Sequence, residues 1–147
     1  MFKHVLIPTD GSAVARKAVK AGVALAKELG AKVTAYHALE ALPPYAYGDG
    51  YIISTATIKR FEEGARAMGR KHLAAVAKAA KAAGVACGPL MTKPMTPYQG
   101  IIDAAKKKRC DVIFMASHGR GEFATLLLGS VTQKVLAHSK LPVLVYR

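Results

Sequence analysis

The sequence predicts an α/β protein: a doubly wound sheet of five parallel strands in the order 3-2-1-4-5, with helices on both faces. Short, almost continuously apolar segments alternate with longer segments whose apolar residues recur every three or four positions. Such apolar runs are typical of parallel strands covered on both sides, and the alternation favours right-handed crossovers between neighbouring strands. With 147 residues, 52 % of them hydrophobic, the chain has the size of one domain, residues 1–147.

Four segments have the length and composition of buried strands: Lys3–Pro8, Lys32–Leu39, Asp111–Ser117 and Leu141–Tyr146. A weaker fifth segment, Val85–Met91, contains a glycine and a proline. Both residue types are disfavoured in a central strand, so this segment is expected at an edge of the sheet.

Helical patterns lie between these strands. In Ala13–Leu29 and Ile58–Ala83 the apolar residues fall on one face of a helix. Thr96–Gln99 begins a third helix that runs to about residue 108, with a capping threonine, a proline in the first turn and a glutamine that can complete a capping box. A last helix is expected from about residue 129 to 138.

The chain has a formal net charge of +13, from 22 Lys and Arg against 9 Asp and Glu. This charge attracts nucleic acid, phosphorylated ligands or anionic surfaces. The cations are spread over the predicted helices, and only Lys106–Arg109 forms a run, at a helix end where cations complement the dipole. Because no recognised nucleic-acid-binding motif or interleaved aromatic residues accompany them, the sequence disfavours nucleic acid as a partner.

The sequence contains no apolar run approaching the ~20 residues of a membrane helix. The first apolar stretch ends at Pro8, too early for a secretory signal. Cys87 and Cys110 lack the spacing of a zinc or redox motif, and we interpret them as buried, inert thiols. These features predict a cytoplasmic protein with no membrane segment.

A ligand is expected where the strand order reverses, beyond the carboxyl ends of strands 1 and 4. The loops that leave these strands are residues 8–12 (PTDGS) and 116–121 (ASHGRG). In the first loop, Asp10 can accept hydrogen bonds from hydroxyl groups, and Ser12 can cap the next helix. In the second, the glycines expose backbone N–H groups and Arg120 adds a cation. A helix beginning at Gly129-Ser130 would favour a phosphate at its N-terminus.

Other common sites are missing from the sequence. There is no Gly-x-Ser-x-Gly nucleophile motif, no Gly-x4-Gly-Lys-Ser/Thr phosphate loop and no complete Gly-x-Gly-x-x-Gly fingerprint. The histidines are interpreted as structural: His72 on an apolar helix face, His37 packed at a strand end, and His4 and His138 at the surface.

The motifs resemble those of the universal stress protein family over essentially the whole chain. The similarity begins with PTDGS and is most specific in residues 116–147. The nucleotide-binding branch of that family carries Gly-x2-Gly-x9-Gly-Ser/Thr, which is matched here, with alanine for the first glycine, by Ala116, Gly119, Gly129 and Ser130.

This resemblance implies a site for an adenine nucleotide, with Asp10 on the ribose hydroxyls. The adenine and ribose side would be lined by Pro8, Thr9, Ala38 and Met115. The ribose and phosphates would be surrounded by Ala116, His118, Gly119, Gly129, Ser130, Val131 and Thr132. We add Arg120 on physical grounds, because its cation can reach an anionic tail. The methyl group of Ala116 is expected to weaken or alter binding rather than abolish it.

The leading interpretation is a regulatory module that holds ATP, ADP or AMP and changes its contacts with an unidentified protein partner. Asp10 can contact Mg²⁺ through water, although one carboxylate is not a metal site. Two alternatives stay open: a slow ATP hydrolase or nucleotidyl-transfer enzyme in the same pocket, and a basic nucleic-acid-binding protein.

Two further expectations concern a loop and an edge. The long connection Glu40–Thr57, with its prolines, glycines and tyrosines, is expected to form a mobile lid beside the site. The last strand, residues 141–146, is an apolar edge that invites pairing with another chain. We therefore expect a homodimer in which two final strands meet antiparallel, as the family resemblance also implies.

Overall fold

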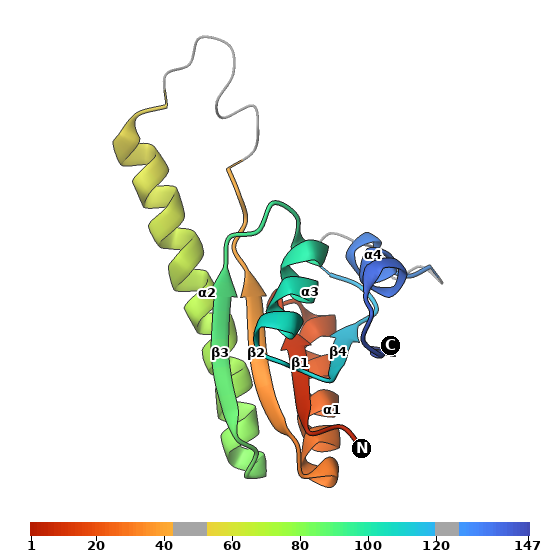
Figure 1. The fold of residues 1–147 in the computed structure, drawn as a ribbon. Helices are drawn as coiled ribbons and strands as arrows, with labels where there is room; N and C mark the ends of the chain where they lie inside the picture. Colours follow the sequence, from red (N-terminus) through yellow and green to blue (C-terminus); the bar gives the residue numbers. More distant parts are fainter. Residues whose placement is uncertain (43–52, 120–126) are drawn as a thin grey trace.

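The structure is a computed structural model that describes residues 1–42, 53–119 and 127–147 (Figure 1). Its elements alternate along the chain as β1 (His4–Pro8), α1 (Ala13–Leu29), β2 (Lys32–Ala38), α2 (Thr55–Ala83), β3 (Cys87–Thr92), α3 (Pro97–Lys107), β4 (Val112–Ala116), α4 (Ser130–His138) and β5 (Val143–Tyr146). Most bounds lie within two residues of those predicted. The main difference is at α2, which begins three residues early because the Ser54 side chain caps it by accepting from the Thr57 N–H.

The five strands form one parallel sheet in the predicted order, β3-β2-β1-β4-β5. In the register of β1 and β2, His4 lies beside Lys32 and Pro8 beside Tyr36. On the other side of β1, Val5 pairs with Val112 of β4. The strand order therefore reverses between β1 and β4, and β3 lies at an edge, as predicted.

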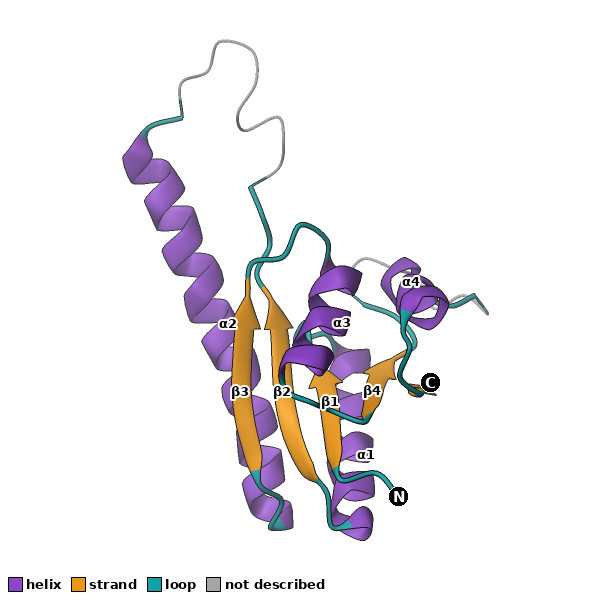
Figure 2. Ribbon diagram, viewed as in Figure 1, coloured by secondary structure: helices purple, strands orange, loops and turns teal. Residues whose placement is uncertain are grey.

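Helices α1 and α2 cover one face of the sheet, and α3 and α4 cover the other (Figure 2). Adjacent residues of β1 point into the two separate cores: Ile7 packs with residues of α1 and α2, such as Val76, whereas Leu6 packs with residues of α3 and α4, such as Ile101. Burial on both faces explains why the strands are apolar without interruption.

Three predictions about side chains are wrong. Thr96 occupies the N-cap of α3, but its side chain makes no capping hydrogen bond. Gln99 donates to Asp103 (3.0 Å), one helical turn on, instead of closing a capping box. His4 is buried, not at the surface, and its Nε2 lies 2.8 Å from Thr34 Oγ1 on the neighbouring strand.

The two cysteines are free thiols. Cys110 is buried as predicted, and burial raises its pKa to about 11, which keeps it protonated at neutral pH. Cys87 is only half-buried, and desolvation also raises its pKa.

Two predicted features fall partly or wholly outside the described residues. Residues 43–52 contain most of the expected lid, including its three tyrosines, and Arg120 belongs to the segment 120–126. Within the described ranges, no helix is long and apolar enough to cross a membrane.

Candidate functional site

A cavity of about 330 Å³ lies at the carboxyl ends of β1, β2 and β4, where the strand order reverses. Every predicted site residue that the structure describes lines it: Pro8, Thr9, Asp10, Ala38, Met115, Ala116, His118, Gly119, Gly129, Ser130, Val131 and Thr132. Residues from four separate stretches of the sequence are thus brought together at one place.

The cavity is also lined by residues that were not among the predicted site residues: Ala15, Tyr36, His37, Glu40, Ala65, Met68, Pro97 and Ile101. Ala65 and Met68 come from α2, and Pro97 and Ile101 from α3, which lie on opposite faces of the sheet. Figure 1 shows α2 extending beyond the ends of the strands. Hydrophobic periodicity indicates only that helix positions such as Met68 and Ile101 lie on a buried face. It does not indicate that they line a ligand site.

Asp10 is held by the turn between β1 and α1. Its Oδ1 accepts from the Ser12 N–H (2.9 Å). The Ser12 side chain accepts from the Ala15 N–H (3.1 Å), and so caps α1 as predicted. Gly11 adopts φ +76°, a left-handed conformation that favours glycine, and its N–H donates to Thr9 Oγ1 (3.2 Å). The turn thus fixes the carboxylate relative to the end of β1.

Two histidines support this turn from the α2 side of the sheet. His37 donates from Nδ1 to the Thr9 carbonyl oxygen (2.8 Å). The His72 ring packs so closely against Gly11 that a Cβ atom at residue 11 would overlap it. The two rings lie with their centroids 5.3 Å apart. Both residues therefore do more than fill an apolar face, and His37 also lines the cavity.

The loop after β4 approaches the Asp10 turn directly. A Cβ atom at Gly119 would lie 2.9 Å from Asp10 Oδ2, so glycine permits this approach. His118 donates from Nε2 to the Leu127 carbonyl oxygen (2.6 Å), and its Nδ1 lies 2.8 Å from Ser117 Oγ. These contacts tie the start of the loop to its end.

Helix α4 begins at the cavity with Ser130, as predicted. Gly129 is its N-cap residue and donates its N–H to the Ser117 carbonyl oxygen (2.8 Å). Because Gly129 and Ser130 at the start of this helix line the cavity, the positive end of the helix dipole faces it. The Thr132 hydroxyl donates to the Ala116 carbonyl oxygen (3.0 Å) and anchors the first turn to β4.

The lining combines an apolar part with a polar end. Met115 and Ala116 are buried in β4, and Ile101 contributes an aliphatic side chain from α3. The polar end contains Asp10 and the start of α4. Such a site can hold a ligand with an apolar, planar part and an anionic part. Among the described residues, no three His, Cys, Asp or Glu side chains lie close enough together to bind a metal ion.

The model of the universal stress protein family matches this sequence over residues 1–147. The chain belongs to this family. Among curated relatives, a universal stress protein of Methanocaldococcus jannaschii is 33 % identical over 150 residues, covering 100 % of this chain and 83 % of its own. A universal stress protein of Thermus aquaticus is 32 % identical over 147 residues, covering 100 % of both chains.

Solved structures show the same fold. A second universal stress protein of M. jannaschii superimposes with a TM-score of 0.77 at 26 % identity, covering 99 % of this chain and 95 % of the other. The dAMP complex of an Archaeoglobus fulgidus universal stress protein has a TM-score of 0.65 at 17 % identity, covering 100 % and 98 %. The AMP complex of an Arabidopsis thaliana family member has a TM-score of 0.69 at 15 % identity, covering 97 % and 90 %.

Proposed function

We propose that this universal stress protein binds an adenine nucleotide in the cavity between β1 and β4 and acts as a regulatory module. The observation that carries the proposal is the junction of an apolar pocket with the Asp10 turn and the N-terminus of α4. A nucleotide has the matching sequence of parts: a planar base, a ribose with two hydroxyl groups, and phosphates. Relatives of the same fold are known in complexes with AMP and dAMP, which supports the choice of ligand.

The base would lie in the apolar part, near Ala38 and Met115. Asp10 would accept hydrogen bonds from the ribose hydroxyls. Its Oδ1 accepts from the Ser12 N–H, and its Oδ2 is the atom that a Cβ at Gly119 would approach, so the carboxylate lies between the two loops that border the cavity. The phosphates would lie at Gly129 and Ser130, where the helix N-terminus stabilises negative charge.

A metal ion has a minor place in this proposal. Asp10 is one carboxylate, and Mg²⁺ usually keeps several waters and binds through one or two carboxylates plus substrate phosphates. Mg²⁺ would therefore arrive with the phosphates and reach Asp10 through water.

Mass spectrometry of natively purified protein tests the identity of the ligand, and calorimetry with ATP, ADP and AMP tests its affinity. We expect binding to all three, with a loss of at least tenfold in Asp10→Ala because the ribose hydroxyls lose their acceptor. Asp103→Ala removes an exposed carboxylate from α3 outside the cavity and is the matched control. Failure of the parent protein to bind any adenine nucleotide would contradict the proposal.

We also propose that the protein forms a homodimer through β5. This strand ends the sheet, and Leu144 and Tyr146 are 36 % and 37 % exposed. The Ile113 N–H donates to the Pro142 carbonyl oxygen, and the Ser117 N–H to that of Tyr146. Because strand residues alternate in direction, the N–H groups of Val143 and Val145 point to the open edge. An apolar edge with outward donors is suited to antiparallel pairing with a second copy.

Sedimentation tests this dimer. Val145→Pro removes an outward donor and should give monomers, whereas the parent protein should sediment as a dimer at tens of micromolar. Val145→Thr keeps the backbone N–H and is the control. Leu144→Pro is less informative, because by the same alternation the Leu144 N–H points toward β4. A monomeric parent protein would remove the proposal.

A further inference from the structure

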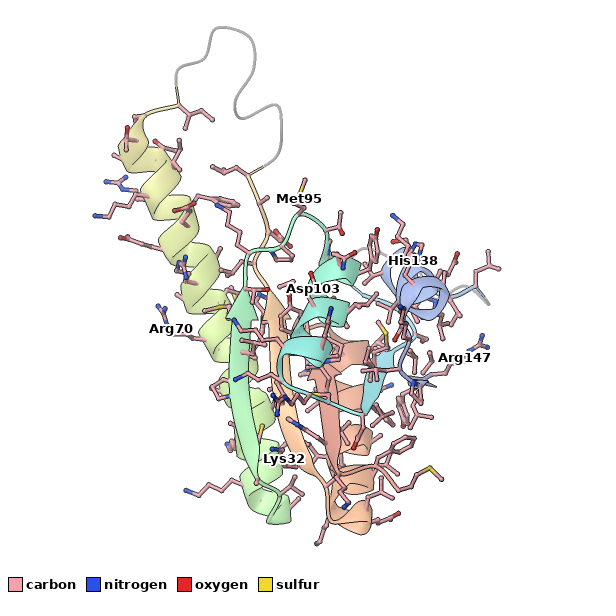
Figure 3. All side chains as sticks on the ribbon, viewed as in Figure 1. Lys32, Arg70, Met95, Asp103, His138 and Arg147 are labelled. Atoms are coloured by element: carbon pink, nitrogen blue, oxygen red, sulfur yellow. The ribbon has the colours of Figure 1, made fainter. Side chains whose placement is uncertain are left out.

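A cation stands at or before the amino end of every strand, at the end of the sheet opposite the cavity. They are Lys3 for β1, Lys32 for β2, Lys81 for β3, residues 106–109 for β4 and Lys140 for β5, and all are exposed. Neighbouring strands of a sheet lie about 4.8 Å apart. The cations therefore gather at this end of the sheet, some at the strand starts and others at the ends of α2 and α3 on its two faces, and we call the group the basic row. Figure 3 shows Lys32 at this end, between the last turns of α1 and α2.

Two carboxylates stand at this end of the sheet, Glu28 in the last turn of α1 and Asp111 before β4, against eight cations in the basic row. Asp111 accepts the backbone N–H groups of Lys3 (2.8 Å) and His4 (3.1 Å), so its carboxylate serves the start of β1. Within the described ranges, no cation of the row forms a salt bridge, and the ion pair that does occur there joins Lys93 to Glu62. A row of unpaired cations produces a local positive potential.

The positive potential is felt inside the protein. His4 lies behind the row, and its pKa is lowered first by burial and next by the charge of Lys32. The charge of Asp111 raises this pKa, and the charge of Lys108 lowers it by less, although Lys32 and Lys108 belong to connections that are far apart in the sequence. Charges from two different connections thus act at one place.

The three helices that end near the row differ in the residue that takes the left-handed position. Helices α1 and α2 end with Gly30 and Gly84 at φ +63° and +73°. Helix α3 ends with the same pair of backbone hydrogen bonds, but Arg109 takes the left-handed position, at φ +53°. Arg109 is the only non-glycine residue with positive φ among those described. Glycine would avoid the steric cost of this conformation. Lys106, Lys107 and Lys108 already complement the helix dipole, so the local structure does not require a fourth cation at residue 109.

We propose that the basic row binds the sugar–phosphate backbone of double-stranded nucleic acid without reading its sequence. A group of long, flexible cations can neutralise successive phosphates of a duplex, and this electrostatic contact needs no base readout. Protein interfaces are depleted of lysine, which argues against an acidic protein. The described aromatic side chains that are exposed, Phe61 and Tyr146, lie elsewhere, so the row lacks the stacking surfaces that single strands require.

Fluorescence anisotropy with labelled DNA duplexes of two unrelated sequences tests this proposal. We expect similar affinities for both, falling steeply between about 50 and 200 mM salt. A row variant combines Lys106→Gln, Lys107→Gln, Lys108→Gln and Arg109→Gly, all at exposed positions. It should bind at least tenfold more weakly at low salt, with the salt slope reduced by about two to three.

The matched control removes the same charge from the outer faces of α1 and α2 with Lys17→Gln, Lys20→Gln, Lys59→Gln and Arg60→Gln. It should lose less than about threefold, because these cations lie outside the row. A second row variant, Lys3→Gln with Lys32→Gln, should again weaken binding if the row acts as one surface. Circular dichroism confirms that each variant is folded.

Four results would overturn the proposal. They are no salt-dependent binding by the parent protein, equal losses in the row and control variants, tighter binding to single strands than to duplexes, and row-dependent binding to phosphatidylserine vesicles but not to duplexes. The outcome is independent of nucleotide binding, because the row and the cavity lie at opposite ends of the sheet.

Discussion

The two ends of this parallel sheet are constructed in different ways. At the amino ends, three helices finish with one local motif, and a buried residue follows immediately: Ala31, Val85 or Cys110. At the carboxyl ends, the loops depend on contacts between distant segments, such as Gly119 with Asp10 and His72 with Gly11. The amino end of the sheet is therefore specified mainly by local sequence, whereas the cavity end is specified by tertiary contacts.

A change of glycine to alanine at each end of the sheet is expected to alter stability most, and by very different amounts. Gly11 and Gly30 both have positive φ, but only at Gly11 would a new Cβ atom overlap a neighbour, the His72 ring. We expect Gly11→Ala to lower the free energy of unfolding by roughly 2–4 kcal/mol. Gly30→Ala should cost about 1 kcal/mol, from backbone strain alone. Chemical denaturation measures both.

A double-mutant cycle sharpens this comparison. If the overlap with His72 causes the larger loss, adding His72→Ala to Gly11→Ala should cost less than the two single effects predict. Equal losses for Gly11→Ala and Gly30→Ala would show that the histidine contact is unimportant.

The next largest effect is expected at Gly129, which lines the cavity in an extended conformation that valine can adopt (φ −60°, ψ 152°). Gly129→Val should therefore place its side chain at the proposed phosphate position and weaken ATP binding about a hundredfold. Ser130→Ala removes one hydrogen bond at most, worth ~0.5–1.5 kcal/mol, and serves as the milder comparison. Unchanged affinity in Gly129→Val, measured by calorimetry, would refute the assignment of the phosphates.

A smaller gain in affinity is expected at Ala116, where the family motif has glycine. Ala116→Gly should tighten nucleotide binding by roughly two- to tenfold if the methyl group crowds the ligand. It should also lower stability by up to ~1 kcal/mol, because glycine is more flexible in the unfolded chain. Equal affinities of the two proteins would show that the methyl group is tolerated.

The smallest effect is a gain in stability at the opposite end. Arg109→Gly should raise the free energy of unfolding by about 0.5–1 kcal/mol, because φ +53° suits glycine. Nucleotide affinity should stay unchanged, since the cavity lies at the other end of the sheet. Lys108→Gly, at φ −88°, should lower stability instead and is the control. Loss of stability in Arg109→Gly would mean that the arginine side chain makes a stabilising contact.

The fold could be predicted because its signals are local and repeated. Continuous apolar runs such as β4 are buried on both faces, and patterns such as Ala13–Leu29 present one apolar face. Strand order followed from the alternation and from Gly88 and Pro89, which suit an edge. The position of the cavity followed from the strand order, because the loops that leave parallel strands at their carboxyl ends lie along one edge of the sheet.

Contacts between distant segments could not be predicted, because the patterns of those segments carry no signal for them. His4 is buried because Thr34, thirty residues away, provides a hydrogen-bonding partner on the adjacent strand. His72 and Met68 follow the apolar periodicity of α2, yet one packs on Gly11 and the other lines the cavity. Hydrophobic periodicity specifies which face of a helix is buried, but it does not specify which atoms meet there. That choice depends on how the helix lies against the sheet, a property of the whole chain.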